Sequence, residues 1–281
     1  MSMLESFFDI RKDSGKLFED LEISHNQSLC RQWMNQHPTV FISFKSIDGL
    51  TFDAAYAQLA AVISRLYKSH LYLMDSGRIS PYDKETIDRL SAEKASQNTV
   101  KNSLLTMTEL LAAHYGKPVI LLIDEYDVPL AKASEKNYYP QMLDIMIGLL
   151  QAFKDNSSLK FAVLTGCLRI TKESIFTGTN NFVSDTISDT RLNKFFGFTG
   201  PEVETILKDT DCVEHAARVK MWYDGYHFGS FDLYCPWDVL NYVNKVRTNH
   251  ITEPESFWEH FPGQNLLSNR IMRTGWEDQT S

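Results

Sequence analysis

Two adjacent carboxylates, Asp124 and Glu125, follow directly after an apolar run, Val119 to Ile123. An unbroken run of β-branched residues and Leu is typical of a strand that is covered on both faces, as in a parallel α/β sheet. Acids at the carboxyl end of such a strand lie where open α/β sheets bind ligands. The pair suits nucleotide hydrolysis, in which one acid helps to hold Mg²⁺ and the other orients or deprotonates the attacking water. The alternative is a strand that simply ends at two solvated acids.

A second polar group follows the next predicted strand, residues 160–164. Thr165 and Gly166 end this strand, and Arg169 and Lys172 lie just beyond it. Thr165 stands where a hydroxyl would reach the γ-phosphate and the attacking water, and Arg169 is a weaker candidate for phosphate contact. The alternative is ordinary turn chemistry at Thr-Gly with two solvated cations. Two strand ends with suitable polar groups, in this order, are better evidence for a nucleotide-hydrolysing site than either one alone.

A phosphate-binding loop of the form GxxxxGK[ST] would complete such a site. The 281 residues contain no such loop. Their Gly-Lys pairs, Gly15-Lys16 and Gly116-Lys117, are followed by Leu and Pro, respectively. The chain therefore lacks the backbone nest and the Lys that would neutralise the β- and γ-phosphates.

Hydrophobic spacing predicts the elements that position these residues. Helices are expected over 2–10, over 24–36, from Thr51 through Leu66 and over 139–153, and a further helix that contains Leu104 to Leu111 leads to Gly116. Strands are expected over 38–44, 119–123 and 160–164. Thr51 is a suitable N-cap, and Gly116 is suited to the position just after a helix. Helices that alternate with strands predict a parallel, doubly wound sheet.

The pattern changes after about residue 171. Two helices are expected, one opening at Pro201 and one over 211–222, then a hairpin over 226–234 and a helix over 237–246. Three domains follow from this reading. They are an α/β core over 1–190, a small helical, lid-like region with a hairpin over 191–247, and a loosely ordered tail over 248–281.

Composition excludes several classes of protein. The formal charge is 28 − 36 = −8, which disfavours general nucleic-acid binding. The four cysteines form no CxxC and fit reduced thiols. The N-terminus has no secretory pattern and no apolar run is long enough to span a membrane, so we expect a cytoplasmic protein without membrane contact.

Five stretches in order resemble the AAA-ATPase-like family of bacterial P-loop proteins, whose members often carry a C-terminal PD-(D/E)xK-type nuclease domain. They are VILLIDEYDVPL (119–130), LTGCLRITKESIFTGTNNF (164–182), FFGFTGPEV (195–203), MWYDGYHFG (221–229) and YCPWDVLNYV (234–243). Cys235 departs from the family's usual Asn, and the similarity fades beyond about residue 258. The resemblance implies a three-layer P-loop NTPase core that binds and hydrolyses ATP with Mg²⁺.

The resemblance also assigns roles by residue. It implies that Asp124 holds Mg²⁺ through water, that Glu125 handles the attacking water, and that Thr165 senses the γ-phosphate. The family's first strand and basic phosphate loop run into a helix that resembles MSMLESFFD, so we expect this chain to begin inside that helix. Loss of a central strand would remove roughly 10 kcal/mol of burial, which predicts marginal stability or aggregation.

Two functions remain open at the level of sequence. The first is an ATPase domain that is inactive as an isolated chain because the phosphate loop is absent. The second is a non-catalytic interaction or regulatory module on a degenerate ATPase scaffold. Self-association or a protein partner is expected, and nucleic acid would be bound only through the family's nuclease domain, which this sequence does not contain.

Overall fold

The fold was analysed in a computed structural model of the 281-residue chain. The structure describes residues 1–167, 183–185, 189, 191–228, 231–249 and 253–257. The chain divides into two compact units, Met1–Asn180 and Asn181–Ser281. The domain boundary predicted after residue 190 stays a prediction. Most of the predicted tail, 248–281, lies outside the described residues.

The first unit is built on a parallel sheet with the strand order β1-β2-β3. Its strands are β1 (Thr39–Ser43), β2 (Val119–Asp124) and β3 (Leu159–Leu164). The central strand, β2, is fully buried from Val119 to Ile123, as its unbroken apolar run predicts. The sequence-based prediction of a parallel α/β sheet is confirmed.

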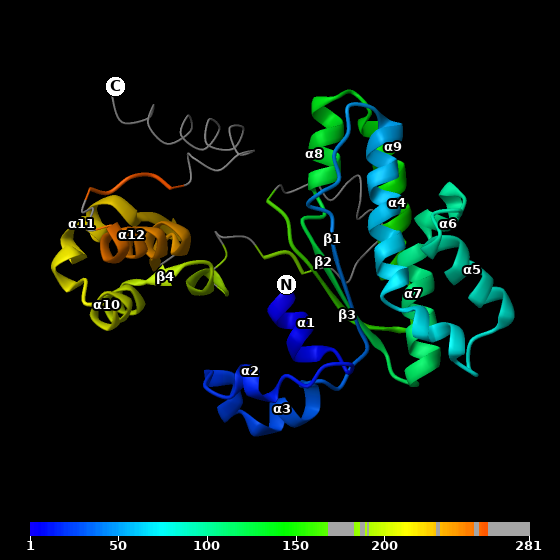
Figure 1. The fold of residues 1–281 in the computed structure, drawn as a ribbon, viewed down its shortest axis with the longest axis horizontal. Coiled ribbons are helices and arrows are strands. Elements are labelled where there is room, and N and C mark those ends of the chain that lie inside the picture. Colours follow the sequence, from blue (N-terminus) through cyan, green and yellow to red (C-terminus); the bar gives the residue numbers. More distant parts are fainter. Residues whose placement is uncertain (168–182, 186–188, 190, 229–230, 250–252, 258–281) are drawn as a thin grey trace. The chain divides into compact units, whose positions relative to one another are not determined.

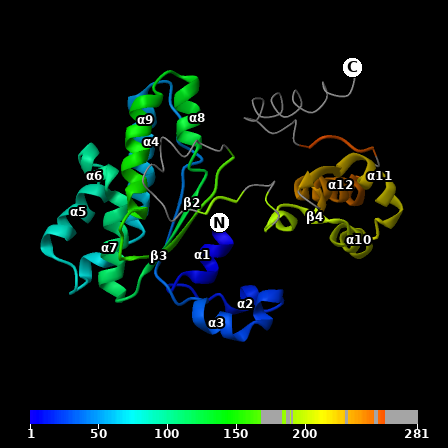
Figure 2. The same cartoon turned by 180° about the vertical axis from the view of Figure 1, so that it is seen from behind.

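Helices cover both faces of this sheet (Figure 1 and, from behind, Figure 2). One face carries α4 (Phe52–Lys68), α7 (Ser103–Tyr115) and α9 (Tyr139–Leu150). The opposite face carries α1 (Ser2–Phe8) and α3 (Gln27–Trp33), whose Phe8 and Trp33 rings both pack against Phe161 of β3. The result is a three-layer arrangement in which both sides of β2 are removed from water.

Local signals fix the ends of several helices. Thr51 caps α4, because its hydroxyl accepts a hydrogen bond from the Ala54 N–H at 3.3 Å. Gly116 ends α7 in the left-handed conformation, with a φ of 64°. Both predictions are confirmed. The remaining helical elements of this unit are α2 (Gly15–Phe18), η1 (Glu22–His25), η2 (Leu71–Asp75), α5 (Pro81–Ser91), α6 (Gln97–Lys101), α8 (Val128–Glu135) and η3 (Gln151–Phe153).

The first helix is shorter than the predicted span 2–10. It ends at Phe8, and Asp9 is already extended. The His37 N–H donates to the Phe8 carbonyl at 3.1 Å, and the Ile10 N–H donates to the His37 carbonyl at 2.9 Å. These two bonds pair the segment with His37, two residues before β1, so strand-like pairing replaces the last helical turn.

The second unit combines helices with a small antiparallel sheet. Its strand order is β4-β6-β5, and β5 pairs with β6 as the predicted hairpin. Its elements are η4 (Asn193–Phe195), β4 (Phe198–Thr199), α10 (Gly200–Asp209), η5 (Val213–His215), α11 (Ala216–Tyr223), β5 (Asp224–Phe228), β6 (Phe231–Tyr234) and α12 (Pro236–Asn249). The strand β4 was not predicted, since two residues carry no detectable period.

The WYDGY stretch, 222–226, contributes to the core of this unit through Tyr223. Its ring is buried and contacts Tyr242, with ring centroids 5.6 Å apart. The Tyr223 hydroxyl donates to the Glu255 carbonyl at 3.0 Å and accepts from the Glu255 N–H at 3.2 Å. Tyr223 therefore packs the core and holds the segment after α12. By contrast, the neighbouring Trp222 is exposed.

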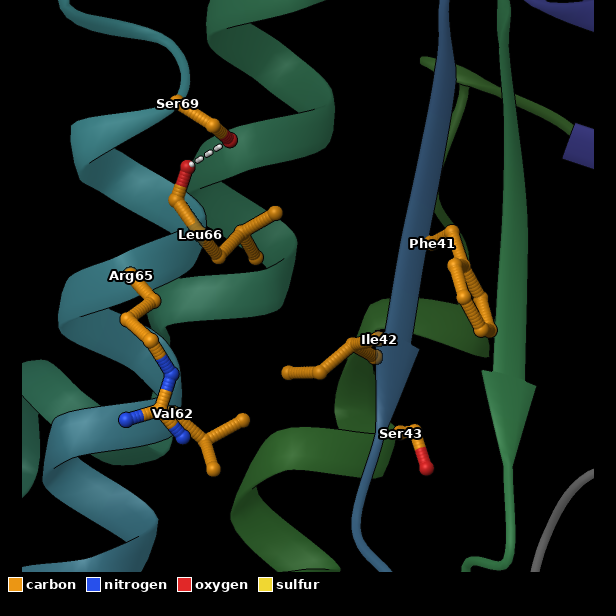
Figure 3. Close-up of a pocket in the computed structure, with 7 residues that line it drawn as sticks. All are labelled: Phe41, Ile42, Ser43, Val62, Arg65, Leu66 and Ser69. Atoms are coloured by element: carbon orange, nitrogen blue, oxygen red, sulfur yellow. Dashed lines mark hydrogen bonds between the residues drawn. The ribbon is translucent and has the colours of Figure 1, made fainter. Parts of the chain in front are cut away.

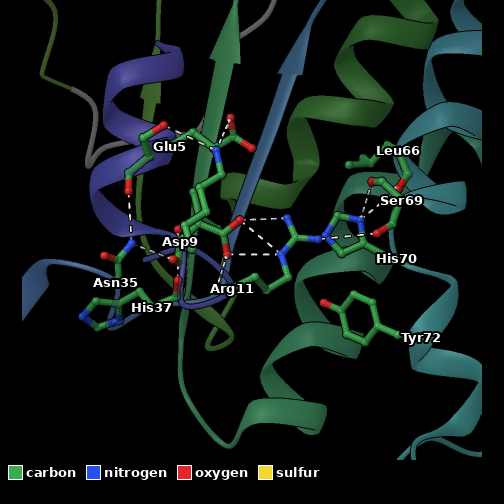
Figure 4. Close-up of polar contacts among 12 residues, drawn as sticks. Glu5, Asp9, Arg11, Asn35, His37, Leu66, Ser69, His70 and Tyr72 are labelled. Atoms are coloured by element: carbon green, nitrogen blue, oxygen red, sulfur yellow. Dashed lines mark hydrogen bonds and ion pairs between the residues drawn. The ribbon is translucent and has the colours of Figure 1, made fainter. Parts of the chain in front are cut away.

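A buried ion pair fastens the segment after α1 to the end of α4 (Figure 4). Asp9 is fully buried, and its carboxylate accepts bonds from the Arg11 side chain at 2.8 to 3.2 Å. The Arg11 guanidinium also donates to the Ser69 carbonyl at 3.5 Å and lies 5.9 Å from the centre of the Tyr72 ring. Beside it, burial lowers the pKa of His70 to about 4, so this imidazole is neutral at pH 7.

We predict that Arg11→Met destabilises the fold by about 3 kcal/mol, because it leaves the buried Asp9 carboxylate without its cation. The matched control is Lys12→Met. Lys12 contacts the Glu5 carboxylate at 3.1 Å, but the Glu5 side chain is 22% exposed whereas that of Asp9 is 1% exposed, so the loss of Lys12 leaves a carboxylate that water can reach and should cost under about 1 kcal/mol. Urea unfolding of both variants measures the difference, and equal losses would contradict a special role for the buried pair.

Candidate functional site

The predicted acid Asp124 closes β2 at the carboxyl edge of the sheet. It is the register partner of Ser43, the last residue of β1, and its carbonyl accepts the Phe44 N–H at 3.0 Å. On the other side, the Thr165 hydroxyl donates to the Asp124 carboxylate. The Thr165 N–H is bonded to the Ile123 carbonyl at 3.0 Å, which fixes this meeting of the ends of β2 and β3. The structure thus brings together two residues that are 41 positions apart in sequence.

The second predicted acid, Glu125, has an unusual backbone. Its φ is 55°, in the left-handed region that a residue with a long side chain rarely adopts. The turn is held by the Val128 N–H, which donates to the Glu125 carbonyl at 3.2 Å, and by the Tyr126 N–H, which donates to the Thr165 carbonyl at 3.2 Å. Strain of this kind persists only where surrounding contacts enforce it, and it clusters at functional sites.

The carboxylate of Glu125 is also electrostatically disfavoured. Burial raises its pKa, and the charges of Asp124 and Asp127 raise it further, while the Lys45 ammonium opposes the rise. Because folding raises this pKa, the ionised side chain destabilises the fold at neutral pH. The cost disappears as the pH falls back through the raised pKa towards the ordinary value of 4.5.

Asp127 is a third acid at this edge, and sequence reasoning assigned it no role. Its side chain is buried, and it accepts a hydrogen bond from the Cys167 N–H at 3.0 Å. It therefore ties the start of α8 to the turn that follows β3. Nothing in the local sequence separates this buried acid from a solvated one, since its burial depends on the turn at 165–167.

Gly166 makes the close approach of these two turns possible. A Cβ at this position would lie 2.6 Å from Asp127 Oδ1 and 2.9 Å from Tyr126 Cε1. Contacts that short force a shift of the surroundings. The Thr-Gly pair that the sequence indicated as a strand end thus has separate tasks. Thr165 contacts Asp124, and Gly166 leaves room for Asp127.

The chemistry of this edge suits a hard cation. Burial raises the pKa of the Cys167 thiol, and the charges of Asp127, Glu125 and Asp124 add to that rise, which shows that the edge is acidic. Carboxylate oxygens are the donors that Mg²⁺ prefers, and Mg²⁺ usually retains several waters beside one or two such ligands. Within the described ranges, no cluster of three or more His, Cys, Asp or Glu side chains is arranged to hold a metal by itself. The Asp124 carboxylate, with water as the remaining ligands, fits this preference of Mg²⁺.

Two candidates of the sequence analysis, Arg169 and Lys172, lie outside the described residues. Lys45 was not predicted. It stands two residues beyond β1, and its charge acts on Glu125. In the part of the chain that the structure describes, no helix is long and apolar enough to cross a membrane.

Comparison with known families identifies the family of this chain. Residues 1–176, more than half of the chain, match the predicted AAA-ATPase family, AAA-ATPase-like. The chain therefore belongs to this family. The matched region contains all four site residues of the sequence analysis, Asp124, Glu125, Thr165 and Arg169.

A curated relative is similar over part of this region. It is an uncharacterized protein in the vnfD 5′ region of Azotobacter chroococcum mcd 1. The two are 29% identical over 127 residues, which are 44% of this chain and 24% of the relative. The match thus spans about a quarter of the relative's length. No solved structure matches the chain.

The left-handed backbone at Glu125 predicts a gain of stability on substitution. Glu125→Gln removes the charge but keeps the long side chain, whereas Glu125→Asn also introduces a residue that tolerates positive φ. We expect Glu125→Asn to be more stable than Glu125→Gln by about 1 kcal/mol. Denaturant unfolding at pH 7 checks this, and equal stability of the two variants would show that the backbone is not strained.

The tight contact at Gly166 predicts the opposite effect. Gly166→Ala should destabilise the first unit by roughly 1–3 kcal/mol, because the added methyl group meets Asp127 and Tyr126. Gly77→Ala is the matched control, since Gly77 also lies in the first unit and a Cβ there meets nothing within 4 Å. Thermal unfolding of both variants tests the pair, and a neutral Gly166→Ala would mean that the two turns separate easily.

Proposed function

We propose that the carboxyl edge of the sheet in the first unit is the acid half of an ATP-hydrolysing centre. The observation that carries this proposal is the hydrogen bond from Thr165 to Asp124, next to Glu125 with its strained backbone and raised pKa. Stability alone would not favour a desolvated acid in a left-handed turn. Membership of the AAA-ATPase-like family supplies independent support.

The proposed roles follow from the positions of the oxygens. Asp124 is an acceptor for water bound to Mg²⁺, and Thr165 holds the orientation of its carboxylate while remaining exposed to a phosphate group. Glu125 orients the attacking water and accepts its proton, a task that a raised pKa favours. Arg169 is proposed to contact phosphate. When bound, Mg²⁺ would neutralise charge on the phosphate oxygens.

We further propose that the 281-residue chain does not hydrolyse ATP by itself. Its sequence holds no GxxxxGK[ST] loop, so nothing of that kind can cradle the β- and γ-phosphates. The loop would have to come from a preceding segment or from a partner. We place the protein in the cytoplasm, where ATP is abundant and thiols stay reduced.

Two preparations test these proposals. The purified chain should neither release phosphate from ATP nor bind labelled ATP in a Mg²⁺-dependent way. A version with a strand and a GxxxxGK[ST] loop fused before Met1 should gain both properties. In that version, Glu125→Gln should lower the hydrolysis rate by about 100-fold or more and keep nucleotide binding, since a general base contributes roughly that much.

Asp124→Asn in the fused version should weaken the Mg²⁺ dependence of labelled-ATP binding. Hydrolysis by the unextended chain that is sensitive to Glu125→Gln would overturn its proposed inactivity. A fused version that binds Mg·ATP but hydrolyses it equally well with Gln at 125 would overturn the role of Glu125. A well-folded fused version that binds no ATP would favour a non-catalytic interaction module on the same scaffold.

A further inference from the structure

One edge of the main sheet is open along β1. The Ile120 N–H donates to the Pro38 carbonyl at 2.9 Å, and the Phe44 N–H donates to the Asp124 carbonyl at 3.0 Å, so the even-numbered residues face β2. Backbone groups alternate in direction along a strand. Those of Thr39, Phe41 and Ser43 therefore point away from the sheet. In the part of the chain that the structure describes, no strand pairs with this side of β1.

At the N-terminal end of β1, the same edge of the sheet already pairs with an extended segment. Phe8 to Ile10 run parallel to the chain at His37 and share two backbone hydrogen bonds with it. The pairing stops there, because the Arg11 N–H turns back to the Asp9 carboxylate at 3.0 Å. The chain thus shows that this edge can be extended by strand addition. Beyond the pairing Thr39 is still buried, and the partly exposed residues of the outer edge are Phe41 and Ser43.

A hollow of about 270 Å³ lies between this open stretch and α4 (Figure 3). It is lined by Phe41, Ile42, Ser43, Val62, Arg65, Leu66 and Ser69, and is called the β1–α4 groove below. Val62 and Leu66 form an apolar wall on the helix. Arg65 is exposed beside them and, among the described residues, makes no ion pair.

We propose that the β1–α4 groove binds an extended segment of a protein partner that carries a carboxylate. The segment adds to β1 through its backbone, as in β-augmentation. Alternate side chains of an added strand share one face, so one set packs against Val62 and Leu66. An acidic side chain of the segment pairs with Arg65, a residue suited to bidentate carboxylate binding. This interaction is independent of the proposed ATPase centre.

A second copy of this chain fits the groove less well. Two-fold pairing of two β1 edges would insert the segment Thr39–Ser43 of each copy into the other's groove. That segment has the sequence TVFIS and contains no acid. Arg65 would then lack a carboxylate partner, so a foreign acidic segment complements the charge of the groove better.

Fluorescence anisotropy with short peptides tests the proposal on the full chain. The probe is a fluorescein-labelled peptide of eight residues in which Val and Thr alternate around one central Glu. A second peptide carries Gln instead of Glu, and two others carry N-methyl groups on all Val or all Thr nitrogens. The Glu peptide should bind about tenfold more tightly than the Gln peptide, and methylation of at least one set should abolish binding.

Protein variants connect the binding to the groove. Arg65→Glu should lower the affinity for the Glu peptide by roughly tenfold or more and leave the affinity for the Gln peptide nearly unchanged. Lys68→Glu is the matched control, because Lys68 is another exposed cation of α4 that does not line the groove. It should bind like the unmodified chain. Circular dichroism verifies that both variants are folded.

Three outcomes would overturn the proposal. The first is no detectable binding of the Glu peptide at up to about 1 mM peptide. The second is equal binding by Arg65→Glu and the unmodified chain, or by both methylated peptides and the parent peptide. The third is a dimer in light scattering that dissociates in Arg65→Glu, which would assign the groove to a second copy.

Discussion

The burial of β2 is the constraint on which the first unit depends. Five consecutive residues, Val119 to Ile123, are closed off by helices on both faces and by a strand on each side. A polar side chain within this run would lose its hydration without gaining hydrogen-bond partners. Polar side chains are therefore expected only where the strand emerges from between the two helix layers. Asp124 is the first residue that meets this condition. The position of the acidic edge is therefore a consequence of how the core is covered.

Several features of the acidic edge at Asp124 to Asp127 destabilise the folded state. Glu125 carries a backbone conformation that suits Gly or Asn and a carboxylate whose ionisation burial disfavours. Asp127 is buried beside it, held by a backbone bond from Cys167. The surrounding core maintains this arrangement because the strands that lead into it are fixed by parallel pairing. An acid that is costly for the fold and lies at the carboxyl edge of an α/β sheet supports the proposed chemical role of this edge.

The two edges of β1 serve different purposes. Its inner side pairs with β2 and carries the register that places Ser43 beside Asp124. Its outer side is partly used by Phe8 to Ile10. The bond from the Arg11 N–H to the Asp9 carboxylate ends that use, and the Arg11 side chain joins the segment to the end of α4. The Asp9 carboxylate thus takes part both in the turn that ends the covered part of the edge and in the ion pair that links this segment to α4. A substitution of Arg11 removes the link to α4, whereas the backbone bond from residue 11 to Asp9 does not depend on the side chain.

The sequence alone determined those elements that carry a strong local signal, because apolar periods and caps act over a few residues. It predicted the three strands of the main sheet, the cap at Thr51, the helix end at Gly116 and the acid pair after β2. It could not show that Thr165 contacts Asp124 or that Asp127 is buried, since both depend on how two turns from distant strands meet. It also missed the pairing of Asp9 with His37, where a tertiary hydrogen bond replaced a helical turn. Local sequence patterns reflect interactions between residues that are close in the chain. The site instead depends on parallel pairing between strands that are far apart in sequence, and only the tertiary structure decides that pairing.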